Sequence, residues 1–378
     1  MRGRFEAPKP RRSGAKTALT VVLVIVAILA LLVVGVVIYY NRMIGKVNHA
    51  QGFSRPDYAA EATNTDASSE TTEEPPTETT TEATTEETTE PHVASPDDYV
   101  NFLVVGQAAR EGEEERFADT MMLFTLNTYE KTITMTSILR DSFTQMPDYK
   151  GHHGGRIKLT TIYHLGYIYG NGVAGSMEMM DLALYNNFGI EVDHNFEIDF
   201  AGFVDIINML GGIDVELTEA ECEWLNGYIE AEQMIEDKYT LTPGMNHLEG
   251  YCALSYARLR KAAGDNESDI KRTSRQQNVV NILMEKIRGM SLPELQNLAN
   301  QVLPLITTSM TSSEITSMLG TVLPMLPQLK LSSAGTCPAD YWGDLVEIYG
   351  DGVKHSVLRF DEKATKQTMR AITKGITD

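Results

Sequence analysis

The hydrophobic pattern of the chain switches between two periods from residue 99 onward. Short apolar or alternating runs predict strands over residues 99–105, 121–126, 132–138 and 213–217. Apolar residues at helical spacing predict helices over residues 176–188, 203–210, 219–234, 279–287, 292–303 and 312–323. A small strand at Val357, Leu358 and Phe360 precedes a final helix. Strands and helices that alternate along a chain favour an α/β fold, with helices on both sides of a mixed sheet.

One apolar run, over residues 252–257, stands directly before a basic pair. It follows a turn at Glu249-Gly250, and its length and composition predict a buried strand. Because side chains alternate along a strand, Arg258 and Arg260 are expected to leave it on the same face. Two guanidinium groups would then point to one place.

The next helix adds two more polar groups. It is expected to begin near Asp269, a residue type that suits the N-cap position. Arg272 and Gln276 are four residues apart, so they share a face of this helix. Arginine offers a planar fork of donors that fits phosphate oxygens, which makes the whole stretch a candidate phosphate site. The alternative is that these arginines pair with acidic residues on the surface of a protein of net charge −20.

The N-terminal part has the pattern of a membrane anchor. Residues 17–40 form a run of 24 residues without a charge, long enough to cross a hydrocarbon core of roughly 30 Å. The basic residues before this run predict that the tail over 1–16 stays in the cytoplasm, so that the rest of the chain lies outside in a single-pass topology. The alternative is a cleaved signal peptide, which would have a shorter apolar region and small residues at the cleavage site.

Charge and composition then divide the chain. Residues 1–46 carry +7, residues 47–98 carry −12, and the remaining residues carry −15. Threonine and glutamate dominate residues 71–90, which predicts that 41–97 is a disordered linker between the anchor and a domain over 98–378. An acidic domain argues against general binding to nucleic acid, so any anion must be bound by a local basic cluster.

The cysteines and the methionines each allow two interpretations. Cys222, Cys252 and Cys337 are too few for a zinc site or a disulfide framework. A Cys222–Cys252 bridge is possible, and isolated buried thiols are the simpler interpretation. The chain contains 18 methionines, which fit a packed core or, alternatively, an adaptable apolar pocket.

Several motifs occur in a distinctive order. They are Arg116-Phe117-Ala118-Asp119-Thr120-Met121-Met122, then Ser137-Ile138-Leu139-Arg140-Asp141, then Lys158-Leu159-Thr160 with Tyr163 and Gly166, then Asp199-Phe200-Ala201-Gly202-Phe203 running to Gly211-Gly212-Ile213-Asp214-Val215, and finally His247-Leu248, Ala253 to Arg260, Arg272 and Arg275-Gln276-Gln277. Over roughly residues 98–290 this order resembles the LytR-CpsA-Psr family of bacterial envelope enzymes.

The resemblance implies a fold and an activity. Family members are α/β/α sandwiches that take a glycopolymer, such as teichoic acid or capsular polysaccharide, from a polyprenyl-pyrophosphate membrane lipid. They transfer it as a phosphodiester to peptidoglycan or another wall acceptor. The resemblance implies that the pyrophosphate is bound by Arg140, Lys158, Arg258, Arg260, Arg272 and Gln276, of which Arg140 and Arg258 act in catalysis, and that Asp119 is a metal ligand. Phosphoryl transfer depends on charge neutralisation and alignment, which such a cluster supplies.

The chain departs from the family pattern at one site that concerns magnesium. The family often has Gly-x-Asp-x-Arg after the first strand, and here Ala108 stands where the carboxylate is expected. This departure weakens the implied Mg²⁺ site, although the following loop offers Glu111, Glu113, Glu114 and Glu115 as substitutes. His247 fits a structural role, and no residue stands out as a general base.

Three functions fit these observations. The first is the glycopolymer transferase. The second is a non-catalytic polyprenyl-phosphate-binding or scaffold member that keeps the pocket and has lost the metal site through Ala108. The third, a secreted adhesin on a stalk, fits the anchor and the linker but leaves the arrangement of arginines unexplained.

Overall fold

The computed structural model describes residues 44–61, 94–107, 116–232, 240–259, 268–350 and 352–376. The basic tail over 1–16 and the expected membrane span over 17–40 lie outside these residues. Among the residues that are described, no helix is long and apolar enough to cross a membrane. The chain divides into two units, Met1–Lys46 and Val47–Asp378, and the fold below is that of the second unit.

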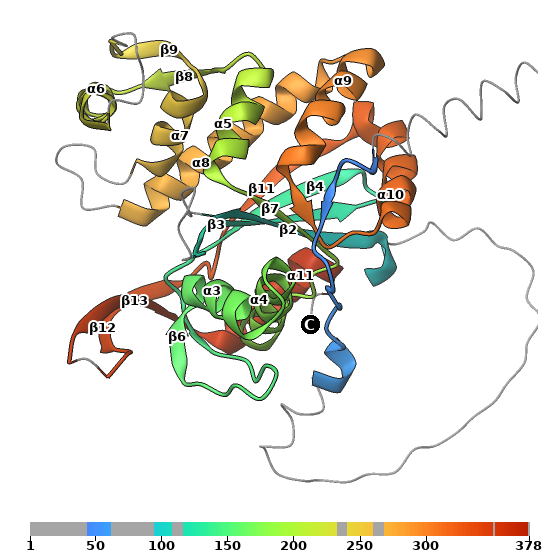
Figure 1. The fold of residues 1–378 in the computed structure, drawn as a ribbon, viewed down its shortest axis with the longest axis vertical. Coiled ribbons are helices and arrows are strands. Elements are labelled where there is room, and N and C mark those ends of the chain that lie inside the picture. The colour runs from blue at the N-terminus through green and yellow to red at the C-terminus, as the bar shows by residue number, and fades with distance from the viewer. Residues whose placement is uncertain are drawn as a thin grey trace, which may run out of the picture. The chain divides into compact units, whose positions relative to one another are not determined.

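A seven-stranded mixed sheet forms the centre of this unit (Figure 1). Its parallel pairs are β1 with β10, β7 with β2, and β4 with β11, and its other pairs are antiparallel. In spatial order the strands are β1 Asn48–His49, β10 Thr307–Thr308, β7 His194–Ile198, β2 Tyr99–Gln107, β3 Ala118–Asn127, β4 Thr132–Ile138 and β11 Lys330–Cys337. The expected mixed α/β fold is confirmed, and β2, β3 and β4 match the three strands predicted over 99–138.

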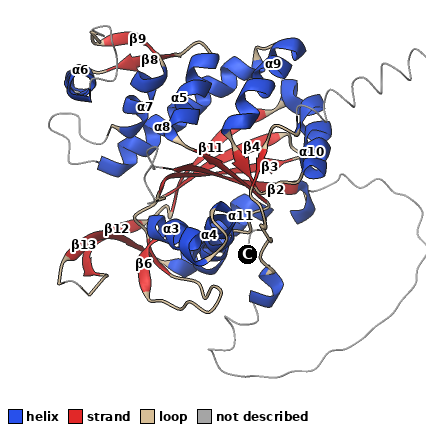
Figure 2. Cartoon of the chain, viewed as in Figure 1, coloured by secondary structure: helices blue, strands red, loops and turns tan. Residues whose placement is uncertain are grey.

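Helices cover both faces of the sheet (Figure 2). On one face lie α3 Leu159–Tyr169, α4 Val173–Phe188 and α11 Glu362–Lys374. On the other lie α5 Phe200–Met209, α7 Gly250–Arg258, α8 Ser268–Arg288, α9 Leu292–Val302 and α10 Ser312–Met325. Outside the sheet are α6 Glu219–Glu232 and the strand pairs β5 Phe143–Gln145 with β6 Arg156–Lys158, β8 Ile213–Leu217 with β9 Gly244–Leu248, and β12 Tyr341–Glu347 with β13 Lys354–Phe360.

The methionine-rich helix α4 is part of the core. Met177, Met180, Leu184 and Phe188 are fully buried, and Gly189 ends the helix with a left-handed backbone at φ 70°. The core interpretation of these methionines is therefore confirmed. The three cysteines are buried and free, and burial raises the pKa of Cys252 to about 12. They are isolated thiols, and the possible Cys222–Cys252 bridge is absent.

The strand predicted over residues 252–257 is wrong, because this segment is the helix α7. All six residues of the run are buried, so no polar face reveals a helical period. Gly250 begins the helix where α7 crosses α5 closely. A Cβ atom there would lie 2.6 Å from Val204 Cγ1 and 2.7 Å from its carbonyl oxygen. Because this segment is a helix, the alternation of side chains along a strand does not place Arg258 and Arg260 on one face.

The linker expected over residues 41–97 differs from the structure in its first part. Residues 48–49 form β1 at the edge of the central sheet, and the amide of Ala50 donates to the Thr308 carbonyl at 2.8 Å. The amide of Ser54 donates to Glu178 Oε1 at 2.9 Å, and Phe53 packs against the buried Met177. This segment has apolar side chains to bury, unlike the Thr/Glu-rich run, which lies outside the described residues.

The C-terminal part completes the same unit. Strand β11 extends the sheet beyond β4, and α11 packs against α4 and β2. Met369 of α11 is buried in the same cluster as Leu103 and Phe188. The strand predicted around residues 357–360 is β13, and the expected final helix is α11.

Candidate functional site

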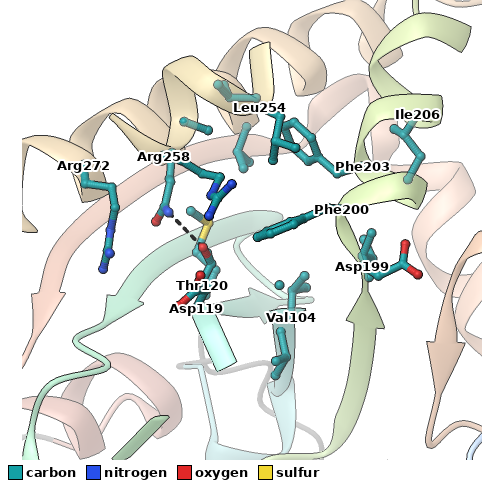
Figure 3. Close-up of a pocket in the computed structure, with 18 of the residues that line it drawn as sticks. Val104, Asp119, Thr120, Asp199, Phe200, Phe203, Ile206, Leu254, Arg258 and Arg272 are labelled. Atoms are coloured by element: carbon teal, nitrogen blue, oxygen red, sulfur yellow. Dashed lines mark hydrogen bonds between the residues drawn. The ribbon is translucent and has the colours of Figure 1, made fainter. Parts of the chain in front are cut away.

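A cavity of about 600 Å³ lies between one face of the sheet and the helices that cover it (Figure 3). The sheet side is formed mainly by alternate residues of β2 and β3, namely Val104, Gly106, Thr120, Met122 and Phe124. The helical side is largely apolar and aromatic, with Phe200, Phe203, Ile206, Trp224, Tyr228, Leu254, Ala257, Val279, Val280 and Leu283. Arg258, Arg272, Thr120 and Asp119 gather on one side of this cavity. An apolar interior with a polar side suits an amphiphile that has a hydrocarbon chain.

Helix α8 contributes both kinds of lining. Arg272 and Gln276 lie on the cavity face, as their spacing predicts, and Val279, Val280 and Leu283 continue that face one to two turns later. Gln276 Nε2 donates to Thr120 Oγ1 at 2.8 Å and thereby joins α8 to the start of β3. The helix therefore changes from polar to apolar along its cavity face.

Arg258 reaches the same cavity from α7. It is in the last turn of that helix, where a positive charge interacts favourably with the helix dipole. Its guanidinium carbon lies 4.4 Å from the centre of the Phe200 ring. Among the described residues, no carboxylate forms an ion pair with Arg258. Figure 3 shows Arg258 and Arg272 on the same side of the cavity as Asp119 and Thr120.

A chain of four alternating charges begins at Asp119. Arg140 Nη1 donates to Asp119 Oδ1, and Arg140 Nε lies 3.8 Å from Asp141 Oδ2. Lys158 Nζ donates to Asp141 Oδ1 at 3.0 Å. These four side chains are between 14% and 25% exposed, so water reaches them only in part. The four charges cancel, and Arg258 adds positive charge at the end of the chain that lines the cavity.

The structure brings together most of the residues expected from the family resemblance. Asp119, Arg258, Arg272 and Gln276 line the cavity. Arg140 is held against Asp119, whereas Lys158 is joined to the site through Asp141 and does not line the cavity. Arg260, Ala108 and the four loop glutamates lie outside the described residues.

Three contributors were not assigned a role from the sequence. Thr120 and Phe200 are in quoted motifs, but their contacts with Gln276 and Arg258 depend on the fold. Asp141 connects Arg140 to Lys158. The spacing of Phe200, Phe203 and Ile206 on α5 is the signal in the sequence that could have predicted an apolar wall.

Arg275 belongs to the same helix but has a structural role. Its Nε donates to Glu221 Oε1 at 2.8 Å, and its Nη1 donates to the Leu259 carbonyl at 3.0 Å. Although burial opposes ionisation of Glu221, hydrogen bonds from Thr218 and Arg275 lower its pKa. Arg275 therefore forms the kind of ion pair that was the alternative interpretation for the arginines of this stretch. Its contacts fix the end of α7 directly after Arg258.

Asp119 is one of two carboxylates that line the cavity. The described part of the chain contains no group of three or more His, Cys, Asp or Glu side chains that could hold one. The other cavity carboxylate, Asp199, accepts from the Gly202 amide at 2.7 Å as the N-cap of α5. Magnesium is commonly bound by one or two carboxylates together with substrate phosphates. Asp119, which is paired with Arg140, would therefore supply at most one of the ligands of a magnesium ion.

Three histidines that could be considered as general bases lie in other places. His247 Nδ1 is 2.7 Å from Asp214 Oδ1 across the β8–β9 pair, in keeping with a structural role. His152 stacks on Tyr169, and His153 Nδ1 is 2.7 Å from Asp148. None of these three lines the cavity.

A buried polar network supports the strand ends beneath the site. Tyr163 Oη donates to Glu197 Oε2 at 2.6 Å, and Arg116 Nη2 donates to Gln107 Oε1 at 3.1 Å. The same Arg116 nitrogen is 3.4 Å from Glu197 Oε1. Burial raises the pKa of Glu197. The network connects β2, β7 and α3 close to the start of β3, where Asp119 lies.

A model of the LytR_cpsA_psr family matches residues 59–330, well over half of the chain. The chain belongs to this family. Two relatives from Bacillus subtilis (strain 168) are named polyisoprenyl-teichoic acid–peptidoglycan teichoic acid transferases. TagV is 30% identical over 191 residues, which are 50% of this chain and 44% of TagV. TagT is 31% identical over 198 residues, which are 51% of this chain and 54% of TagT.

The chain spans about half the length of these two family members. Solved structures show the LytR-CpsA-Psr fold over a larger part of it. TagT bound to LIIa-WTA has a TM-score of 0.54 at 21% identity, over 76% of this chain and 95% of TagT. Protein gbs0355 from Streptococcus agalactiae has a TM-score of 0.55 at 23% identity, over 72% of this chain and 87% of its own.

Proposed function

We propose that this chain is a phosphotransferase that moves a glycopolymer from a polyprenyl-pyrophosphate lipid to peptidoglycan or another wall acceptor. One observation carries the proposal: a single cavity combines a largely apolar interior with Arg258, Arg272, Gln276 and Asp119 on one side. The apolar part suits a polyprenyl chain, and the polar part suits a pyrophosphate. The names of TagT and TagV, which are teichoic acid transferases, support it.

The proposed reaction breaks a phosphoanhydride bond and forms a phosphoester bond. A hydroxyl oxygen of the acceptor attacks the phosphorus that carries the glycopolymer, and the bond from this phosphorus to the bridging pyrophosphate oxygen breaks. The products are a phosphodiester on the acceptor and polyprenyl phosphate. The hydroxyl proton leaves with the phosphate or passes to water, so that atoms and charge balance.

The arginines supply positioning and charge. Arg258, supported by the Phe200 ring, and Arg272 offer planar forks to the non-bridging oxygens. Arg140 and Lys158 are positioned by Asp119 and Asp141 at the edge of the site. Negative charge accumulates on the equatorial and leaving oxygens during phosphoryl transfer, and fixed cations stabilise it. A magnesium ion held by Asp119 and the substrate would neutralise further phosphate charge.

We place the protein in the cell membrane as part of the same proposal. The uncharged run over residues 17–40 would be the single anchor, and the basic tail over 1–16 would stay in the cytoplasm. The domain would then lie outside the cell, on the side where wall polymers are assembled. This location also gives the cavity access to a lipid substrate.

The central test compares Arg258→Ala with a matched arginine. Full-length protein in detergent is given a polyprenyl-pyrophosphate-linked saccharide, with and without magnesium, and lipid binding and polyprenyl phosphate release are measured. Loss of a charge-assisted contact costs about 1.5–3 kcal/mol, which weakens donor binding roughly ten- to hundredfold. Arg258→Lys should fail almost as badly, because the planar fork is lost.

The control is Arg288→Ala at the end of the following helix, α8. Arg288 pairs with Glu285 at 2.8 Å on the surface, so its loss should leave binding and turnover unchanged. Tight binding of the lipid without turnover in the wild type would favour the scaffold interpretation. A folded protein that neither binds nor cleaves the lipid would contradict both interpretations.

A further inference from the structure

A hairpin near the C-terminus exposes an unusual amount of apolar surface. Strands β12 and β13 form a two-stranded sheet that projects from the unit at the lower left of Figure 1. Its exposed large side chains are Trp342, Leu345, Tyr349 and Val353, each 51% to 61% exposed. The hairpin lies beyond residues 59–330, which match the family model. Exposed apolar side chains on a projecting hairpin indicate an interaction surface, and Trp342 is the largest of them.

The base of this hairpin is attached to the segment that carries Arg140. Strand β11 runs parallel to β4, and the amide of Leu139 donates to the Cys337 carbonyl at 2.8 Å. The amide of Leu358 on β13 donates to the Asp141 carbonyl at 2.9 Å. Because β4 and β11 end side by side, the hairpin after β11 and the Arg140-Asp141 pair after β4 start from the same edge of the sheet.

The tip of the hairpin approaches the site from a second direction. Tyr349 Oη lies 3.4 Å from Thr161 Oγ1 in the first turn of α3, close to Lys158. The Tyr349 ring also makes an edge contact with His355, with centres 4.9 Å apart. The hairpin is therefore joined to the Arg140-Asp141 segment near its base, and its tip contacts the first turn of α3.

The chemistry around Trp342 suits a carbohydrate. Arg359 is its cross-strand neighbour, and Arg359 Nε donates to Asp344 Oδ2 at 2.6 Å. An exposed indole is thus flanked by a guanidinium and a carboxylate. A pyranose ring has apolar C–H faces that pack on an aromatic ring, and hydroxyls at its rim that bond to such polar neighbours.

The charge of the hairpin helps to choose the partner. Residues 340–360 contain four acids, Asp340, Asp344, Glu347 and Asp351, and two bases, Lys354 and Arg359. A segment of net charge −2 is repelled by anionic lipids and by anionic polymers. A polysaccharide strand of mainly uncharged hexosamine units meets no such repulsion.

We infer that the β12–β13 hairpin binds the glycan strand of the wall acceptor and brings its hydroxyl toward Arg140 and Asp119. This inference rests on the proposed transferase function and adds the site of the second substrate. The donor enters the apolar cavity on one face of the sheet. The acceptor is held on the hairpin at the adjoining sheet edge, so that the two substrates meet at the chain of charges between them.

The two tryptophans of the chain allow a binding test that needs no catalysis. Trp224 lines the cavity and Trp342 is on the hairpin. In full-length Trp224→Phe protein, Trp342 is the only tryptophan and should change its emission on titration with soluble, uncross-linked peptidoglycan glycan strands. In Trp342→Phe protein, Trp224 should not respond to the glycan and should respond to polyprenyl pyrophosphate.

A kinetic test separates the acceptor from the donor. Trp342→Ala should raise the KM for glycan strands about tenfold, the value expected for loss of a well-packed aromatic contact, and leave the KM for the lipid donor unchanged. The matched control is Tyr129→Ala. Tyr129 is 47% exposed and lies in the turn between β3 and β4, at the opposite end of these strands from Asp119 and Ile138. Its loss should leave both KM values unchanged.

The possible outcomes distinguish the two proposals. If glycan changes the Trp342 emission but neither the wild type nor any variant releases polyprenyl phosphate, the hairpin binds glycan and the transferase proposal is wrong. If transfer occurs while the Trp342 emission and the glycan KM of Trp342→Ala stay unchanged, the hairpin inference is wrong. A Trp342 response to phosphatidylglycerol vesicles in place of glycan would also overturn it, and would make the hairpin a membrane contact.

Discussion

The two faces of the central sheet are made from the same strands but differ in how they are filled. On β3, Met121 and Leu123 point into a core in which Met180 and Leu184 of α4 are fully buried. Thr120, Met122 and Phe124 alternate with them and line the cavity on the other face. One face is closed by packing, and the other is covered by helices that stand far enough away to leave a cavity.

Because of this difference, we expect side chains of the packed face to determine stability and side chains of the cavity face to determine ligand binding. Close packing makes each side chain of the filled face contribute strongly to the free energy of unfolding. Side chains of the cavity face have fewer neighbours to lose, so their truncation should affect a ligand more than the fold. A substitution on the packed face can therefore be paired with a similar substitution on the cavity face, and each serves as the control for the other.

The largest contrast is expected between two phenylalanines. Phe188 is fully buried on the packed face and stacks on Phe360 with ring centres 5.0 Å apart. Phe188→Ala should lower the free energy of unfolding by about 3–5 kcal/mol in urea denaturation. Phe200→Ala on the cavity face should cost much less stability and weaken donor binding, because Arg258 loses its ring contact. Equal losses of stability would show that the cavity face is packed as tightly as the core.

The second contrast is between two arginines of α8. Arg275→Met removes hydrogen bonds to Glu221 and to the Leu259 carbonyl, and should cost about 1.5–3 kcal/mol of unfolding free energy. Arg272→Met should weaken donor binding, because Arg272 lines the cavity. Urea denaturation and lipid binding are measured for both variants. If Arg275→Met abolished binding without loss of stability, the structural role given to Arg275 would be wrong.

The smallest effect concerns a buried acid on the packed face, Asp181. It accepts from Asn195 Nδ2 at 2.8 Å, and burial raises its pKa well above the ordinary value. Between its unfolded pKa, near 3.9, and its folded pKa, the unfolded state holds fewer protons, so this group lowers stability as pH rises. Asp181→Asn removes this dependence, at up to about 1.4 kcal/mol per pH unit.

The check is urea denaturation of both proteins from about pH 4 to about pH 7. The stability of Asp181→Asn relative to the wild type should increase as pH rises through this window. A difference that stays constant with pH would mean that Asp181 ionises in the folded protein as it does in the unfolded chain.

The sequence predicts those parts of the fold in which a periodic pattern survives. The strands over residues 99–138 and the helix that ends at Gly189 have such patterns, and they are close to their predicted places. Residues 252–257 of α7 are all buried and show no helical period, so this run was predicted to be a strand. Strand β7 was not predicted because His194, Asn195 and Glu197 give it a polar sequence.

The site divides in a similar way. The shared face of Arg272 and Gln276 follows from helical spacing and is confirmed. Arg258 reaches the cavity, but from the last turn of a helix and not from a strand. Its contact with Phe200 joins residues far apart in sequence, and no local pattern contains such a contact. The chain of charges from Asp119 to Lys158 likewise depends on the end of β4 lying beside β6 and the start of β3.

The position of strand β1 limits the distance between the folded unit and the expected membrane anchor. Val47 is buried at the start of the folded unit, and only residues 41–46 separate it from the end of the expected span. Six residues extend at most about 20–22 Å. The Thr/Glu-rich run lies between two segments of the same folded unit, over 47–61 and 94–107, so it adds nothing to this length. A tether this short would confine the search for a lipid donor to the membrane plane and raise the effective concentration of the donor at the cavity.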